Sequence, residues 1–137
     1  MKPEEINLVR STWAQVVPIK EQAAELFYGR LFALDPSLEP LFKGDMKAQG
    51  QKLMAMIGTA VGGLTQPETI LPALRDLGRR HVGYGVQAQH YDTVGAALLW
   101  TLEKGLGPAF TPETRQAWAQ TYDLVAGVMK EAAAPSR

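Results

Sequence analysis

Apolar residues recur at helical spacing along almost the whole chain, and we find no convincing alternation of period two that would indicate a strand. The clearest case is the series Ile70, Leu74, Leu77 and His81, which places four side chains on one helix face at i, i+4, i+7 and i+11. Helices of this kind bury their apolar faces by packing against one another. The pattern therefore predicts an all-α domain of six or seven helices.

Short joints rich in proline, glycine and capping residues separate the apolar stripes. We expect Pro18 to end the first helix, and Asp35-Pro36 to begin a short helical turn as N-cap and first residue. Thr111-Pro112 has the same form and predicts the start of the last helix. Between these joints we expect helices at about residues 46–64, from 65–68 to a break at 81–86, and at about 88–105, with another break at 43–45.

The 137 residues have an ordinary globular composition, 46% hydrophobic and 20% charged. A formal net charge of zero argues against a basic nucleic-acid footprint and against a polybasic membrane surface. No apolar run approaches the roughly 18 residues of a membrane span, and the N-terminus lacks the apolar core of a signal peptide. We therefore expect one domain over residues 1–137 in the cytoplasm, with neither nucleic acid nor membrane as a partner.

His81 ends the apolar stripe of residues 70–81 and is one of two histidines in a chain without cysteine. The absence of cysteine excludes disulfides, iron–sulfur clusters and thiol catalysis. One imidazole on an apolar face cannot build a zinc site, which needs several nitrogen or sulfur ligands. It can be a buried core histidine, or the single protein ligand of a metal held in an organic ring such as haem. We expect the second histidine, His90, to lie at the surface or at a helix start.

Four separated segments give the chain a resemblance to a known family. They are residues 26–42 (LFYGRLFALDPSLEPLF), 48–54 (AQGQKLM), 77–99 (LGRRHVGYGVQAQHYDTVGAALL) and 117–129 (AWAQTYDLVAGVM). In order and spacing they resemble the globins, specifically the single-domain bacterial globins and the globin half of flavohaemoglobins. The resemblance implies the globin fold, a 3-over-3 helical sandwich around haem b (iron protoporphyrin IX).

The resemblance implies that four residues lie on the side of the haem where gases bind. Tyr28 matches the distal tyrosine of the B helix, and Gln49 matches the distal position of the E helix. Leu53 lies one turn after Gln49 on the same helix face, whereas the neighbouring Gln51 does not share that face. Phe42 matches the phenylalanine that stacks on the haem. Tyr28 and Gln49 would then be two hydrogen-bond donors to bound oxygen.

The resemblance places four further residues on the opposite side of the haem. His81 matches the proximal ligand, which coordinates iron through Nε2. Leu77, one turn earlier, matches the leucine under the porphyrin, and its carbonyl oxygen lies within plausible reach of the other His81 nitrogen. Tyr91 and Val94 match positions that wall the proximal side and the haem edge. The neighbouring Arg79-Arg80 pair is expected either at a haem propionate or in solvent.

One position departs from the flavohaemoglobin pattern. In that family a tyrosine and a glutamate accompany the proximal histidine. Tyr91 is present, but the glutamate position falls near Ala133, and the nearest acid, Glu131, is out of register. A carboxylate bonded to the histidine would push electron density to the iron and favour oxygen activation. The departure therefore favours holding oxygen over splitting it.

The resemblance implies reversible oxygen binding, as a carrier or store, with high affinity because two donors reach the bound gas. The expected partners are diatomic gases, namely oxygen, nitric oxide and carbon monoxide. An enzymatic alternative is nitric oxide dioxygenation or nitrite reduction, which would need an external reductase. A third alternative is a haem-based gas sensor, or a globin-fold interaction module without haem. We assign no catalytic residue from the sequence.

Overall fold

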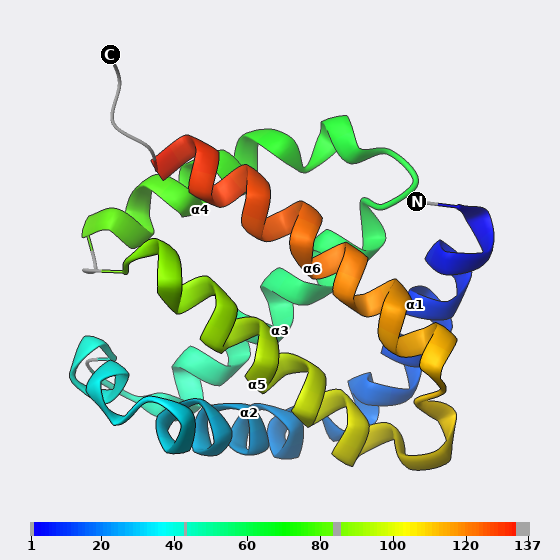
Figure 1. Cartoon of the computed structure of the whole chain (residues 1–137), viewed down its shortest axis with the longest axis horizontal. Helices are drawn as coiled ribbons and strands as arrows, with labels where there is room; N and C mark the ends of the chain where they lie inside the picture. The colour runs from blue at the N-terminus through cyan, green and yellow to red at the C-terminus, as the bar shows by residue number, and fades with distance from the viewer. Residues whose placement is uncertain (1, 43, 84–85, 134–137) are drawn as a thin grey trace.

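The computed structural model describes residues 2–42, 44–83 and 86–133, and every regular element within these ranges is helical (Figure 1). The α-helices are α1 (Pro3–Val16), α2 (Lys20–Leu34), α3 (Met46–Gly62), α4 (Leu71–Gly83), α5 (Ala88–Leu106) and α6 (Pro112–Ala133). Short 3₁₀ turns lie between them: η1 (Val17–Ile19), η2 (Pro36–Leu41), η3 (Pro67–Thr69) and η4 (Gly107–Ala109). The all-α prediction is confirmed for the part of the chain that is described.

The helix starts predicted from proline and capping residues are confirmed. The Asp35 carboxylate accepts a hydrogen bond from the Ser37 backbone N–H at 3.1 Å, and η2 begins directly after Asp35. The Thr111 hydroxyl oxygen accepts a hydrogen bond from the Thr114 backbone N–H at 3.2 Å, and α6 begins at the next residue. His90 also lies at a helix start, where its Nδ1 accepts the Gln87 N–H at 2.9 Å. These contacts join near neighbours in sequence, so local pattern could predict them.

The region between α3 and α4 differs from the prediction. Helix α3 ends at Gly62 rather than at residue 64, and the next predicted helix is divided into η3 and α4. Pro67 begins η3, and Pro72 lies in the first turn of α4. Backbone N–H groups in the first turn of a helix make no hydrogen bond within the helix, so proline costs none there. Each proline therefore starts its own segment. Residue 43 of the first predicted break, and residues 84–85 of the second, lie outside the described residues.

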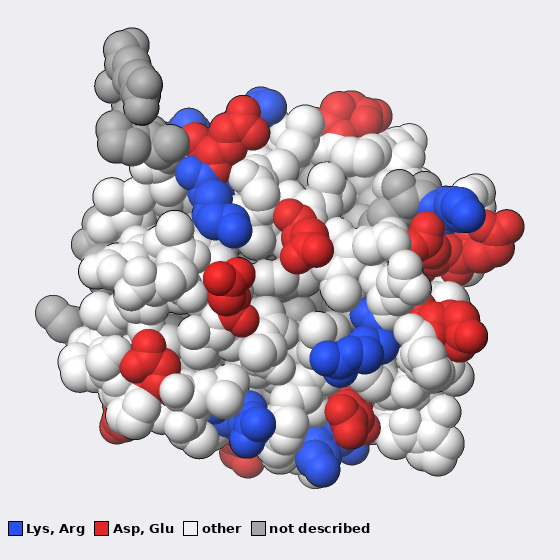
Figure 2. All heavy atoms as spheres, viewed as in Figure 1, with Lys and Arg blue, Asp and Glu red and all other residues white. Residues whose placement is uncertain are grey.

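The helices pack in crossed pairs rather than as a simple bundle. Helix α6 contacts α1, α4 and α5, while α2 contacts both α3 and α5. In Figure 1, α5 and α6 run diagonally across the molecule, with α4 at one end of α6 and α2 below α5. None of the described helices is both long and apolar enough to cross a membrane. On the face drawn in Figure 2, acidic and basic side chains are interspersed among uncharged ones.

One buried hydrogen bond joins the first and last helices. The Trp118 Nε1–H of α6 donates to the Thr12 hydroxyl oxygen of α1 at 2.8 Å, and both side chains are buried. The Thr12 hydroxyl in turn donates to the Leu8 carbonyl oxygen at 2.6 Å. The Trp13 ring centroid lies 6.2 Å from that of Trp118. The polar groups in this part of the core are thus satisfied, which avoids the cost of burying them unpaired.

Helices α4 and α6 approach each other backbone to backbone at Gly78. A Cβ at this buried position would lie 2.8 Å from the Met129 Cα and would clash with the Met129 carbonyl group. Backbone atoms cannot rotate out of the way as a side chain can. Glycine is therefore required at this crossing, three residues before His81.

We expect Gly78→Ala to lower the free energy of unfolding by about 1–3 kcal/mol, because the added methyl group must push two helices apart. Gly127→Ala on α6 is a matched control, since nothing lies within 4 Å of a Cβ there. Alanine at that position should raise the free energy of unfolding by about 0.5–1 kcal/mol, because glycine costs this much in a helix interior. Urea unfolding followed by circular dichroism measures both. If both substitutions changed the free energy of unfolding by the same sign and size, the close crossing of α4 and α6 at Gly78 would be contradicted.

Candidate functional site

Tyr28 lies at the centre of an aromatic group on the inner face of α2. Its ring centroid is 5.1 Å from that of Phe27, 6.0 Å from that of Phe32 and 5.3 Å from that of Phe42. We call the surrounding side chains the α2 cluster. Its buried members are Phe27, Leu31, Leu38 and Ala97, and its half-buried members are Tyr28, Phe32, Leu41, Phe42, Leu53, Val94 and Leu98.

The Tyr28 hydroxyl points toward α3. It donates a hydrogen bond to the backbone carbonyl oxygen of Gln49 at 3.3 Å, which is longer than an ordinary O–H···O bond. Burial raises the pKa of Tyr28 to about 12, because the phenolate would lose its hydration. The hydroxyl is therefore a neutral donor at physiological pH. Gln49 itself is half-buried, whereas the alternative Gln51 is exposed.

A close crossing of α2 and α3 positions this pair. A Cβ on Gly50 would lie 2.9 Å from the Cβ of Ala24, so only glycine fits without a shift. Gly50 directly follows Gln49, and Ala24 lies one turn before Tyr28. The small residues thus bring the Gln49 backbone within reach of the Tyr28 hydroxyl. The sequence pattern did not identify this crossing, although the adjacency of Gln49 and Gly50 was visible.

His81 lies in the last turns of α4 and is anchored by its own helix. Its Nδ1 is 2.8 Å from the Leu77 carbonyl oxygen, as the i, i+4 spacing predicted. Since a carbonyl oxygen only accepts, Nδ1 holds the proton, and the ring's lone pair lies on Nε2. Burial lowers the pKa of His81, and the bond to Leu77 opposes that shift. The imidazole is therefore neutral at pH 7, which is the form that ligates metals.

A second apolar group, the α6 cluster, surrounds Leu77. Its buried members are Tyr91, Ala126 and Met129, and its half-buried members are Leu77, Val86, Tyr122 and Val125. The Tyr122 hydroxyl donates to the Tyr91 carbonyl oxygen and so joins α6 to α5. A Cβ on Gly95, one turn after Tyr91, would lie 2.7 Å from the Tyr122 ring. The sequence analysis did not identify this bond.

The structure brings the sequence-predicted residues together in two groups. Tyr28, Phe42, Leu53 and Val94 belong to the α2 cluster, with Gln49 bonded to Tyr28. Leu77 and Tyr91 belong to the α6 cluster, and His81 is bonded to Leu77. Helix α5 links the groups, because Tyr91 and Val94 lie one turn apart on it. The sequence analysis did not identify Phe32 and Leu98 as members of the α2 cluster. Each lies four residues, or one helical turn, after a predicted site residue: Phe32 after Tyr28, and Leu98 after Val94.

The charged residues that the sequence analysis considered for roles beside His81, Arg80 and Glu131, are exposed. Arg80 forms an exposed ion pair with Asp76 at 2.6 Å, one turn earlier on α4. Glu131 is exposed, and Ala133 ends α6 as a half-buried residue. Within the described residues, no group of three or more histidine, aspartate or glutamate side chains is placed to hold a metal ion.

A spectrophotometric titration tests the burial of the Tyr28 hydroxyl. With a pKa of about 12, Tyr28 stays protonated at pH values where an ordinary tyrosine, with a pKa near 10, has ionised. The pKa of Tyr28 is higher in the folded state than in the unfolded state. The stability that the protonated Tyr28 hydroxyl contributes is therefore present below about pH 10 and is lost as the pH rises through 12. We therefore expect Tyr28→Phe to leave the rise in phenolate absorbance up to about pH 11 unchanged. A smaller rise in the variant would show that Tyr28 titrates normally.

Comparison with known proteins identifies the family. The sequence model of the globin family matches residues 25–129. The chain is 34% identical to a neuroglobin of Danio rerio over 137 aligned residues, which cover 90% of this chain and 86% of that protein. It is 30% identical to a flavohemoprotein of Xylella fastidiosa over 94% of this chain, and spans 33% of that protein's length.

A solved structure gives the same result for the fold. The structure of a bacterial globin from Campylobacter jejuni superposes with a TM-score of 0.85 over 96% of both chains, at 24% sequence identity. The helix order, the crossed packing and the sequence matches agree with one another. This chain belongs to the globin family, and its all-α structure is the globin fold.

Proposed function

We propose that this protein holds haem b between the α2 and α6 clusters and uses it to bind oxygen reversibly and tightly. Globins bind diatomic gases at a haem group, and the chain's membership of that family supports haem-based gas binding in general. The observation that favours tight oxygen binding is the half-buried, neutral Tyr28 hydroxyl beside Gln49. His81, anchored at Leu77, is the proposed iron ligand.

The residues fit a flat apolar group with one imidazole ligand. Phe42, Leu53 and Val94 of the α2 cluster are half-buried apolar side chains, as is Leu77 beside His81. A porphyrin inserted against such side chains would complete their burial, which is favourable at about 25 cal/mol per Å² of apolar surface. When bound, haem would supply an iron atom that can bind oxygen, nitric oxide or carbon monoxide.

The chain's own residues set the properties of the site. The Leu77 carbonyl oxygen fixes the tautomer and orientation of the His81 ring, so Nε2 presents its lone pair. With haem in place, the Tyr28 hydroxyl and the Gln49 side-chain amide would be the two hydrogen-bond donors available to a polar gas ligand. The long bond from Tyr28 to the Gln49 carbonyl is weak, so the hydroxyl can turn to a better acceptor. Such bonds are stronger in a dry pocket than in water.

Holding oxygen is favoured over activating it by the residue at position 133. The resemblance to flavohaemoglobins would place a glutamate there, whereas this chain has Ala133 at the end of α6. Without a carboxylate from that position, the His81 ring is oriented by the neutral Leu77 carbonyl oxygen. A neutral acceptor makes the imidazole a weaker electron donor to a bound metal than a carboxylate would. We therefore propose carriage or storage of oxygen as the primary role.

We expect His81→Ala to lose the Soret band of haem bound with an axial imidazole. The proposed ligand is removed, while the apolar lining is unchanged. His90→Ala is the matched control, since His90 caps the start of α5 and should be dispensable for haem binding. The absorbance spectra of both purified variants after addition of haem test this prediction. A normal Soret spectrum in His81→Ala, with an unchanged response to carbon monoxide, would refute this ligand assignment.

We expect Tyr28→Phe to speed oxygen dissociation roughly 2- to 13-fold, which corresponds to one hydrogen bond of about 0.5–1.5 kcal/mol. Carbon monoxide is less polar when bound, so its dissociation rate in the same variant serves as an internal control and should change less. Stopped-flow replacement of each gas measures the rates. If oxygen dissociates from the variant no faster than from the wild type, Tyr28 is not a donor to it.

A further inference from the structure

A depression of about 760 Å³ lies where the start of α1, the connection from α3 to α4 and the middle of α6 meet. Each of the three segments contributes an apolar side chain to its lining: Ile6 of α1, Leu64 of the connection and Leu124 of α6. Leu64 is buried and Ile6 half-buried, whereas Leu124 is 38% exposed. The volume falls within the range of about 300–1,000 Å³ that is usual for small-molecule pockets in proteins.

The polar side chains of this depression include two amides and one carboxylate. Asn7 of α1 and Gln120 of α6 each have an amide oxygen that can accept hydrogen bonds, and Asp123 of α6 has a carboxylate. Gln120 and Asp123 are three residues apart and so share one face of α6. Asp123 is the one charged residue of the lining, and within residues 2–42, 44–83 and 86–133 it forms no ion pair. The depression therefore combines an apolar wall with an unpaired negative charge.

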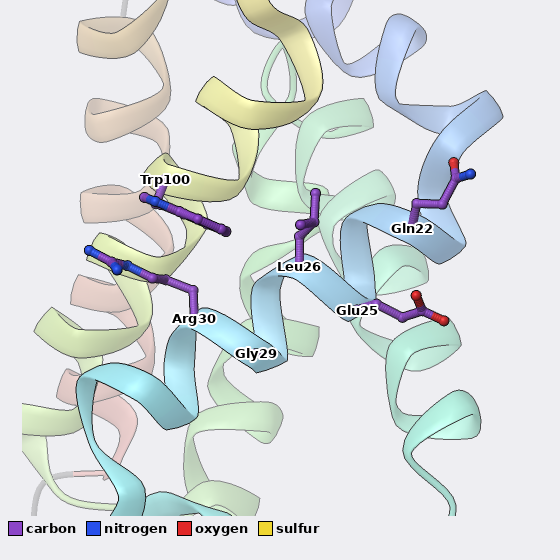
Figure 3. A pocket seen from close by; sticks show the side chains of 6 residues that line it. All are labelled: Gln22, Glu25, Leu26, Gly29, Arg30 and Trp100. Carbon is purple, nitrogen blue, oxygen red and sulfur yellow. The ribbon is translucent and has the colours of Figure 1, made fainter.

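This depression is separate from the proposed haem site, because none of its lining residues belongs to the α2 cluster or to the α6 cluster. It also differs from a smaller groove of about 400 Å³ on the outer face of α2. That groove is lined by Gln22, Glu25, Leu26, Gly29, Arg30 and Trp100 (Figure 3). In Figure 3, Arg30 extends toward the Trp100 ring, while Glu25 lies at the opposite end, so the groove contains both signs of charge. The groove beside Trp100 therefore serves as an internal comparison for a ligand of one charge.

We propose that the depression between α1 and α6 binds a small primary ammonium ion with an apolar body, such as an alkylamine. A primary ammonium group has three N–H donors and no acceptor, which suits a lining whose polar groups include two amide oxygens and the Asp123 carboxylate. The apolar body lies against Leu64 and Leu124 and removes their exposed carbon atoms from water. Asp123 repels an organic carboxylate, and it gains no ion pair from an uncharged ligand. The charge of the lining thus selects an organic cation.

Titration of the purified full chain with n-hexylammonium chloride tests the proposal, with carbon monoxide added so that a haem iron is not open to the amine. Two-dimensional amide NMR should show saturable shifts at Leu64, Thr65 and Asp123, with a dissociation constant on the order of 1 mM. The amides of Leu26 and Gly29, in the groove beside Trp100, should not shift. Propylammonium should bind about tenfold more weakly or worse, because it lacks three methylene groups. Absence of saturable shifts at about 10 mM, equal binding of uncharged n-hexanol, or equal shifts at Leu26 and Gly29 overturns the proposal.

A charge reversal at Asp123 separates recognition of the ammonium group from general adhesion to an apolar surface. Asp123→Lys should reverse the preference, so that n-hexanoate binds at least about threefold more tightly than n-hexylammonium. Asp123 is exposed, so the fold should tolerate the change. Glu131→Lys makes the same charge change two turns later on α6 and should leave the affinity for n-hexylammonium unchanged, because exposed charges at that separation are screened by salt. If Asp123→Lys still prefers the ammonium, or if Glu131→Lys weakens its binding equally, Asp123 does not select the ligand.

Discussion

The close approach of helix backbones at two glycines is the constraint on which the site depends. Gly50 of α3 lies against Ala24 of α2, and Gly78 of α4 lies against the backbone of Met129 in α6. Each glycine directly adjoins a residue of the site, Gln49 in the first case. Because protein interiors are close-packed, a methyl group at either crossing would shift whole helices rather than one side chain. Helix spacing, and with it the reach of the polar groups, follows from these contacts.

Helix α5 contributes residues to both the α2 cluster and the α6 cluster and so connects them. Val94 packs in the α2 cluster, and Tyr91, one turn earlier, lies in the α6 cluster. The Tyr122 hydroxyl bonds to the Tyr91 carbonyl oxygen and holds α6 beside this turn. His81 has a defined partner in the Leu77 carbonyl oxygen, whereas the buried Tyr91 hydroxyl has no hydrogen-bond partner among the described residues. In such surroundings each hydrogen bond is stronger than in water, which is why the identity of the donors decides the chemistry.

Helix α2 has two faces with different surroundings. Its inner face contains Tyr28, whose hydroxyl is directed at α3. Its outer face contains Leu26 and Gly29, which line the groove beside Trp100. Because the faces use different residues, a change at Gly29 leaves the Tyr28 donor and its aromatic neighbours in place.

The sequence by itself determined that the chain is helical and, outside the stretch between α3 and α4, where its helices start. The Asp35 and Thr111 caps and the anchoring of His81 by Leu77 join residues at most four positions apart, so local pattern could predict them. Assignment of the eight site residues to a haem pocket needed the globin resemblance in addition, because helical pattern alone does not choose between a bundle and crossed layers.

Only the tertiary structure decided which helices cross, that the Tyr28 hydroxyl bonds the Gln49 carbonyl 21 residues away, and that Tyr122 locks Tyr91. Such contacts depend on how closely distant backbones can approach, which local periodicity does not encode.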